Sequence, residues 1–430
     1  MIRATRTQWI KFAVVLALYL IFLVWLRSWL GLVVVPFIFD AYITKKIPWT
    51  WWRESKNRHV VTVMGWVDAI VFALVAVYFV NLYFFQNYVI PSSSLEKSLL
   101  TGDYLFVSKM SYGPRVPQTP LHMPLAQHTL PFFNCKSYLE HPQWDYKRVK
   151  GLGDVQLNDI VVFNFPAGDT VATGVPNDDI YRLSYGAGKE LAKPVDLASM
   201  TPEQQRVVYD YYYQLGREYL KENPQNFGEI ISRPVDRREN YVKRCVGLPG
   251  QTLEIKDRII YLDGKANKEP DNVQYRYLVK TKRPIPDDLA HELGISKEDM
   301  MMYYTDASVY NMPLTEKAKA GLLARKDIVV SIENTPADDA GGLYPLNMYK
   351  NWTTDNYGPV WIPKKGETVK LTIENLPVYE RPIHVYEGNE LAVKDGKIYI
   401  NGKETDEYTF KMDYYWICLL YTSPSPRDKR

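Results

Sequence analysis

The chain of 430 residues has few cysteines, few histidines and almost no net charge, and each shortage excludes a class of protein. Its three cysteines, Cys135, Cys245 and Cys418, lie far apart, so neither a disulfide scaffold nor a CxxC metal site is expected. The six histidines form no HxH or HxxxH pair, so we expect no metal site. A formal net charge of +3 gives no strongly basic surface, and nucleic acid is not expected as a partner.

What the chain does have is a strongly apolar N-terminal segment of about 90 residues. Residues 60–85 are apolar apart from Asp68 and Asn81, and a bilayer core needs about 20 such residues. Asp68 lies about two turns from one end of this run, where it can reach the interface or pair with another span. We therefore expect a transmembrane helix here and no functional role for Asp68.

Residues 9–43 form a second apolar stretch, which Arg27 and Ser28 interrupt. It is either one long helix with a short interfacial continuation or a tight hairpin of two shorter spans, and we favour the hairpin. No small-residue cleavage site follows these segments, so they are expected to be anchors rather than a removable signal peptide.

The loop at 44–59 decides the orientation of the anchor. It carries five basic residues, Lys45, Lys46, Arg53, Lys56 and Arg58. Under the positive-inside rule this loop is cytoplasmic, so the residues after Phe85 lie outside the cytoplasm whether the anchor has two or three spans. Residues 1–89 are thus expected to form a membrane anchor whose partner is the lipid bilayer.

Beyond Ile90 the chain is expected to be mainly β. Runs of β-branched and aromatic residues separated by Gly, Pro, Asn and Asp occur at 103–109, 159–165, 240–248, 252–265, 367–376 and 396–403. The helical exceptions are expected at 202–223 and 287–301. Residues 90–417 would then be one extracytoplasmic β domain with insertions at about 168–235 and 270–365.

Two segments of this region echo each other. LEIKDRIIYLDGK (253–265) and LAVKDGKIYINGK (391–403) share a strand, a Lys-Asp turn, a second strand and an Asp-Gly or Asn-Gly turn. Asp-Gly and Asn-Gly are favoured in short hairpin turns, so we expect two similar hairpins rather than a repeat architecture.

Three serines, Ser92 to Ser94, stand where the last apolar run ends. A serine hydroxyl is a weak nucleophile that needs a base nearby. If Ser94 opens a turn, its backbone N–H and the Ser92 hydroxyl could both point at one oxyanion. The alternative is structural, because Pro-Ser-Ser-Ser is also a common entry to a helix with a serine cap.

Lys243, in the strand-like run NYVKRCVGL, is the candidate base. A lysine accepts a proton only as the neutral amine, so its pKa must fall from about 10.4, and burial against apolar neighbours lowers it. Strand alternation places Tyr241, Lys243 and Cys245 on one face and Arg244 on the other. An ordinary edge-strand lysine would show the same pattern, so the strand alone does not decide between the two.

Three sequence blocks together resemble bacterial type I signal peptidase, the membrane-anchored Ser/Lys endopeptidase that removes signal peptides from exported proteins. IPSSSLEKSLLTGDYLFVSKMSYG (90–113) resembles the nucleophile box, LNDIVVFNFP (157–166) the following strand box, and ENYVKRCVGLPG (239–250) the lysine box. The resemblance implies a signal-peptidase-type β domain in the bacterial inner membrane, facing the periplasmic side. It also implies signal-peptide-bearing preproteins as partners and no cofactor.

Carried over by position, the resemblance makes Ser94 the nucleophile, Lys243 the general base, and Ser92 with the Ser94 amide the oxyanion hole. The positions that would line shallow pockets for the small side chains of Ala-x-Ala sites are Ile90, Pro91, Leu95, Tyr241 and Val242. The family usually has Met and then Pro-Thr after the nucleophile, where this chain has Leu95 and then Lys97-Ser98.

The larger departure is at the C-terminal end. The family continues with a Gly-Asp-Asn-Arg box that positions the lysine, whereas here Trp416 is followed by ICLLYTSPSPRDKR. We expect residues 418–430 to be a foreign tail translated from sequencing-adapter DNA, with a divergent natural C-terminus as the alternative. Without that box the chain is expected to be poorly active, and an inactive membrane-anchored binding or scaffold protein is the competing hypothesis.

Overall fold

The computed structural model describes most of the chain. The described residues are 5–90, 99, 102–130, 133, 135–166, 170–175, 178–269, 273–301, 304–306, 308–335, 343–345 and 352–418. The chain divides into two compact units. The first comprises residues 1–88, 104–154 and 234–238, and the second comprises residues 89–103, 155–233 and 239–430.

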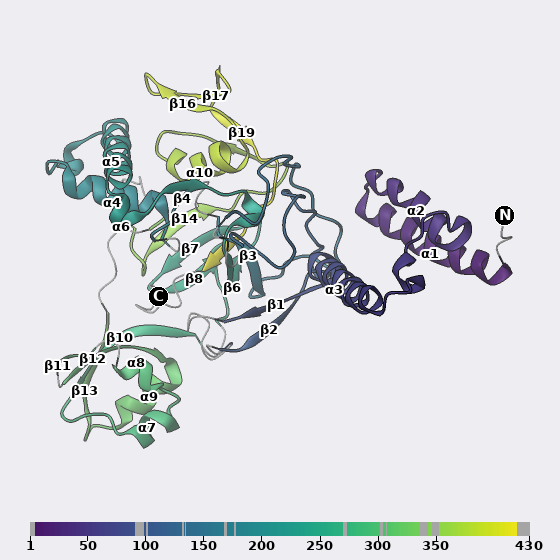
Figure 1. The fold of residues 1–430 in the computed structure, drawn as a ribbon. Coiled ribbons are helices and arrows are strands. Elements are labelled where there is room, and N and C mark those ends of the chain that lie inside the picture. Colours follow the sequence, from purple (N-terminus) through teal and green to yellow (C-terminus); the bar gives the residue numbers. More distant parts are fainter. Residues whose placement is uncertain are drawn as a thin grey trace. The chain divides into compact units, whose positions relative to one another are not determined.

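The first unit begins with a helical hairpin. Helix α1 (Arg6–Leu26) ends at Arg27, whose φ of 50° turns the chain back (Figure 1). A returning arm follows, made of η1 (Leu30–Val34), α2 (Val35–Phe39) and η2 (Asp40–Thr44). The Phe39 and Phe12 ring centroids lie 5.4 Å apart, so the arm runs antiparallel to α1. The backbone therefore follows the hairpin path and not the single long helix.

Helix α3 (Arg58–Tyr83) is the second long apolar helix of this unit. It follows the short turn η3 (Trp51–Glu54), and the Asn57 side chain caps its first turn by accepting from the His59 N–H. Both α1 and α3 are long and apolar enough to cross a membrane, judged by length and composition. Asp68 pairs with Arg53 of the preceding turn at 3.7 Å, which agrees with the structural role expected for it.

A two-stranded ribbon follows α3 directly. Strand β1 (Phe85–Val89) pairs with β2 (Tyr104–Ser108), and the Phe85 and Phe106 rings stack with centroids 4.6 Å apart. The described residues from Gly113 to Leu152 form no long strand, and isolated antiparallel bridges join the two halves of this segment.

The second unit contains several small antiparallel sheets. One has the order β20-β6-β3, with β3 (Ile160–Asn164), β6 (Asn240–Gly247) and β20 (Trp416–Cys418). Another has the order β14-β7-β8-β9, with β14 (Tyr357–Trp361), β7 (Thr252–Lys256), β8 (Ile259–Leu262) and β9 (Lys265–Ala266). A buried apolar cluster that includes Val246, Leu253 and Ile362 joins β6 to this second sheet.

The two expected hairpins are confirmed. The first is β7-β8-β9, and the second is β16 (Leu391–Lys394), β17 (Lys397–Ile400) and β18 (Lys403–Glu404). Asp263-Gly264 and Asn401-Gly402 all have positive φ, as the favoured two-residue hairpin turns require.

The strand expected at 367–376 is only partly present. Strand β15 (Thr368–Lys370) pairs with β19 (Glu407–Thr409), but α10 (Leu376–Arg381) and η7 (Pro382–Tyr386) follow it. Thr372 and Asn375 exchange side-chain to backbone hydrogen bonds at 2.8 and 3.2 Å, and Pro377 opens the helix. This local turn ends the strand, because the side chains offer the backbone an alternative to the sheet.

The first insertion connects β3 to β6. It is closed at its base by β4 (Thr170–Ala172) paired with β5 (Ile230–Ser232). Between them lie α4 (Ile180–Leu191), η4 (Leu197–Ser199), α5 (Pro202–Glu222) and α6 (Pro224–Phe227). A Cβ built on Gly188 of α4 would lie 1.7 Å from the Tyr212 carbonyl of α5, so the two helix backbones touch at this glycine.

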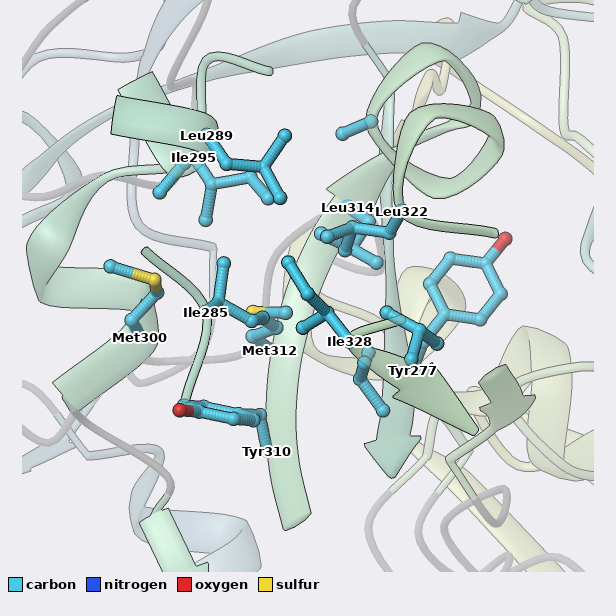
Figure 2. Close-up of a cluster of buried hydrophobic side chains, with 14 residues drawn as sticks. Tyr277, Ile285, Leu289, Ile295, Met300, Tyr310, Met312, Leu314, Leu322 and Ile328 are labelled. Carbon is cyan, nitrogen blue, oxygen red and sulfur yellow. The ribbon is translucent and has the colours of Figure 1, made fainter. Parts of the chain in front are cut away.

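The second insertion is a module with its own core (Figure 2). Its sheet has the order β11-β12-β10-β13, with β11 (Tyr304–Asp306), β12 (Val309–Thr315), β10 (Gln274–Thr281) and β13 (Val329–Asn334). Helices α7 (Asp287–Glu292), α8 (Lys297–Met301) and α9 (Glu316–Ala324) contribute to it. Met312, Leu314 and Leu322 are fully buried in this core, so residues 274–334 form a fold that is more than a long loop.

Arg258, in the β7–β8 turn, holds both ends of this module. Its guanidinium donates to the carbonyls of Arg276 at 3.2 Å and Thr335 at 3.0 Å, and it pairs with Asp355 at 2.9 Å. Its φ is 74°, a left-handed conformation for which the matching hairpin uses Gly396. Arg258 therefore occupies a backbone position suited to glycine, and its side chain fixes both ends of the module to the β7–β8 turn.

Candidate active site

Lys243 lies in the middle of β6, which is the central strand of its sheet. Val161 of β3 is its register partner on one side, and Ile417 of β20 faces Cys245 on the other. The Lys243 side chain is only 8% exposed and Cys245 is completely buried, whereas Tyr241 is half-buried. The described pairing of β20 with β6 reaches Arg244, so Lys243 itself has its register partner on β3, and what separates it from an ordinary edge-strand lysine is its burial.

The opposite face of β6 carries Arg244, as strand alternation predicts. The Arg244 Nη1 donates to the Asn158 carbonyl at 2.7 Å. The Asn158 and Asp159 backbone in turn exchanges hydrogen bonds with Cys245, at 2.7 and 2.8 Å. These bonds fix the start of β3 against the lysine strand. Val246 is also buried, so towards its end β6 is covered on both faces.

The predicted pocket residues Tyr241 and Val242 lie beside the lysine on the same strand. Tyr241 faces Phe163 in the register and stacks on Phe165, with ring centroids 4.9 Å apart. Val242 faces Val162 and is half-buried. The aromatic rings of Tyr241, Phe163 and Phe165 therefore adjoin Lys243 on its own face of the sheet, whereas the Val242–Val162 pair lies on the opposite face.

Ile90 closes the base of the serine-bearing segment. Its N–H donates to the Asp103 carbonyl at 3.0 Å, and its own carbonyl accepts from the Gly102 N–H at 2.9 Å. The side chain is 3% exposed. Gly102 has a φ of 93°, so this closing turn uses a conformation that favours glycine.

The remaining predicted residues, Pro91, Ser92, Ser94 and Leu95, lie outside the described residues. The described part of the site is therefore its lysine strand, two of its pocket residues on that strand, and the closed base of the serine segment. The expected tail at 418–430 also lies outside the described residues, except for Cys418, which ends β20.

Cys245, the thiol nearest in sequence to Lys243, is not poised to react. Burial raises the pKa of the Cys245 thiol, which favours the protonated form, and its Sγ lies 3.5 Å from the Gly247 carbonyl. A nucleophilic cysteine needs the thiolate, so Cys245 is a packing residue. Within the part of the chain that the structure describes, no three His, Cys, Asp or Glu side chains gather to hold a metal ion.

Sequence reasoning missed the role of Trp416 and the strand it begins. Trp416 faces Gly247 in the sheet register, and its ring packs 5.5 Å from that of Tyr357. This strand begins at the end of the segment TFKMDYYW (409–416). Its aromatic residues indicate burial, but a partner strand more than 150 residues away leaves no local signal.

A family model and several individual relatives both match this chain, and all of them are signal peptidases. A family model described as signal peptidase, peptidase S26, matches residues 63–303, which is more than half of the chain. Signal peptidase I P of Bacillus subtilis subsp. natto is 20% identical over 279 residues, covering 64% of this chain and 90% of that protein. No solved structure matches.

Shorter matches cover less of their relatives. Signal peptidase I of Helicobacter pylori (strain ATCC 700392 / 26695) is 42% identical over 56 residues, or 13% of this chain and 18% of that protein. Signal peptidase I of Rickettsia prowazekii (strain Madrid E) is 24% identical over 165 residues, or 35% of this chain and 56% of that protein. The chain thus spans less than two thirds of the length of both.

Proposed function

This chain belongs to the signal peptidase family, peptidase S26, and on that basis we propose that it is a membrane-bound serine endopeptidase that removes signal peptides from exported preproteins. The observation that carries the proposal is the family match over 63–303, which includes both Ser94 and Lys243. The burial of Lys243 on a central strand supports the role given to it.

In the proposed reaction Ser94 is the nucleophile and Lys243 is the general base. The neutral Lys243 amine takes the Ser94 hydroxyl proton as Oγ bonds to the scissile carbonyl carbon. The oxyanion that forms accepts hydrogen bonds from the Ser92 hydroxyl and the Ser94 N–H. The C–N bond then breaks, and the lysine ammonium returns the proton to the leaving amine.

Water completes the proposed cycle. Lys243 takes a proton from a water molecule, whose oxygen attacks the acyl-enzyme carbonyl. Collapse of the second tetrahedral species returns the lysine-held proton to Ser94 Oγ and releases the signal peptide as its carboxylic acid, which loses its remaining proton to solvent. Atoms and charge balance without a metal or an organic cofactor.

The substrate would lie against the apolar surface beside the lysine. Ile90, Pro91, Leu95, Tyr241 and Val242 are the proposed lining of shallow pockets for small side chains. The stacking of Phe165 on Tyr241 supports this, because it fixes the aromatic ring and limits the depth of any pocket there.

We propose that α1 and α3 anchor the chain in the bacterial plasma membrane, with residues 90–417 on the extracytoplasmic side. None of the 26 residues of α3 is buried. At 1.5 Å per residue the helix is about 39 Å long, against a hydrocarbon core of about 30 Å. An apolar helix of this length with none of its residues buried is the form a lipid-facing span takes.

The experiment is cleavage of a preprotein by the full chain in membranes. We expect Ser94→Ala and Lys243→Ala each to lower the cleavage rate by about a thousandfold or more, since the two residues act as a unit. The matched controls are Ser93→Ala, from the same serine cluster, and Lys256→Ala, an exposed lysine on β7. Both controls should leave the rate unchanged.

Two results would count against the proposal. Unchanged cleavage in either the Ser94 or the Lys243 variant excludes the dyad. A complete lack of cleavage by the unsubstituted chain, with the protein folded, would instead favour the inactive binding or scaffold protein.

A further inference from the structure

The described residues between Pro114 and Val149 (114–130, 133 and 135–149) form an antiparallel ribbon that the proposed mechanism does not use. Arg115 bridges Arg148 at its base, and His122 bridges Tyr138 further out. Backbone hydrogen bonds connect the two arms between these bridges, from Trp144 to Gln118 at 2.8 Å and from Leu139 to Leu121 at 2.9 Å. We call residues 114–149 the 114–149 ribbon and residues 119–139 its tip.

The tip is unusually poor in charge. Between Thr119 and Leu139 the sequence has one lysine, Lys136, and no arginine, aspartate or glutamate. The charged residues stand at the base of the ribbon instead. They are Arg115, Glu140, Asp145, Lys147 and Arg148. Most of the charge of the ribbon therefore lies outside its tip, where Lys136 is paired with the adjoining Glu140 at 2.5 Å.

Along residues 121–125 of the tip, the alternation of exposure is the reverse of that in a water-facing strand. Leu121, Met123 and Leu125 are 50%, 53% and 65% exposed, whereas His122 between them is turned inward. Leu139, opposite Leu121 on the other arm, is 61% exposed. A strand with one solvated face normally puts its polar residues outside and its apolar residues inside.

The inward face of the tip is polar and makes specific contacts with residues 236 and 237. The Asp236 carboxylate accepts from the Thr119 N–H at 2.9 Å and from its hydroxyl at 2.8 Å. The Arg237 guanidinium lies 5.8 Å from the centre of the Tyr138 ring. These contacts fix which face of the ribbon looks outward, so the exposed leucines are held there by the fold.

The ribbon lies beside the C-terminal ends of both long apolar helices of its unit. The His122 ring is 5.2 Å from the ring of Tyr78, five residues before the end of α3. That places the contact about 7.5 Å below the helix end. The Trp25 indole, near the end of α1, donates to the Lys150 carbonyl at 3.2 Å, and Lys147 donates to the Arg27 carbonyl at 2.7 Å.

We propose that the tip of the 114–149 ribbon lies in the outer interfacial layer of the bilayer, with Leu121, Met123, Leu125 and Leu139 in contact with lipid. The inference rests on the membrane anchoring in the proposed function. Because α3 is about 9 Å longer than a hydrocarbon core, its end reaches the headgroup layer, and the tip contacts α3 about 7.5 Å below that end, near the outer boundary of the core. The occupant of the apolar face is then the phospholipid of the outer leaflet.

The test places spin labels on the full chain reconstituted in phospholipid vesicles. In a Cys135→Ser, Cys418→Ser background, Leu121→Cys and Leu139→Cys carry the label, while Cys245 stays because it is fully buried. Ile70→Cys on α3, 54% exposed, is the lipid reference. Val207→Cys on α5, an exposed apolar residue of the first insertion, is the water reference.

We expect the Leu121 and Leu139 labels to be relaxed more by oxygen than by a water-soluble nickel chelate, as at Ile70. If both labels instead match Val207 while Ile70 reports lipid, the ribbon proposal is wrong and the anchor stands. If Ile70 itself reports water, the anchor and the ribbon proposal fail together. Preprotein cleavage, measured on the same samples, tests the peptidase proposal separately from both.

Discussion

The module at 274–334 offers a sharp test of whether the second insertion folds as a unit. Leu322 and Leu323 are adjacent in α9, but Leu322 is fully buried in the module core and Leu323 is 45% exposed. Leu→Ala removes the same atoms from the same helix at both positions. The helix propensity changes equally, so a difference between the two variants measures burial.

The magnitudes follow from the packing. Truncation of a fully buried leucine costs about 2–5 kcal/mol, whereas an exposed one changes stability by about 0.5 kcal/mol or less. A module of this size has a stability of about 3–9 kcal/mol. A loss of about 3 kcal/mol raises its unfolded population by about a hundredfold, since each 1.4 kcal/mol is a factor of ten.

Hydrogen exchange followed by mass spectrometry measures this effect. In Leu322→Ala we expect peptides from β12 and β13 to exchange about a hundredfold faster, with β6 unchanged and Leu323→Ala like the unsubstituted chain. Equal exchange in the two variants would refute the packing of α9. Faster exchange of β6 in step with β12 would refute the independence of the module.

Two further predictions concern backbone contact and charge. Gly188→Ala should lower the melting temperature, because the new Cβ would meet the Tyr212 carbonyl. Gly186→Ala in the same helix has nothing within 4 Å of its Cβ, so it should stabilise the protein by about 0.5–1 kcal/mol and raise the melting temperature. Equal shifts in the two variants would refute the close approach of the helices. Burial, together with the nearby Arg115 and Arg148, lowers the pKa of Lys109 from 10.5 to about 8. The folding free energy lost by burying the charged ammonium is therefore fully present below pH 8, and it disappears as the pH rises towards 10.5. Lys109→Met should therefore melt at a higher temperature than the unsubstituted chain at pH 7, and a gain that does not shrink by pH 10 would contradict this.

Local patterns predicted much of the fold. The strand character and alternation of NYVKRCVGL placed Lys243 and Cys245 on one face, and both are buried. Asp263-Gly264 and Asn401-Gly402 predicted the two hairpins because their turn chemistry acts over two residues. Signals of this kind depend only on neighbours in the sequence.

Features that depend on distant residues were not predicted. The pairing of Trp416 with Gly247 joins segments far apart in the chain, and no period or turn residue encodes it. The expected strand after Lys370 gave way to a Thr372–Asn375 turn, whose hydrogen bonds compete with the sheet. The placement of Ser92 and Ser94 stays a prediction, since they lie outside the described residues.

The pairing of β4 with β5 has a consequence for the order in which the chain folds. Asn164 and Asn240 are register partners that flank the whole first insertion, and joining the ends of so long a loop carries a large entropy cost. If α4, α5 and the β4–β5 pair form first, the insertion is already closed. The flexible loop between Asn164 and Asn240 is then reduced to the few residues that connect β3 to β4 and β5 to β6. The strand that carries Lys243 would then find β3 through a nearly local contact, which speeds the pairing. The helical insertion can thus act as an internal folding aid for the lysine strand.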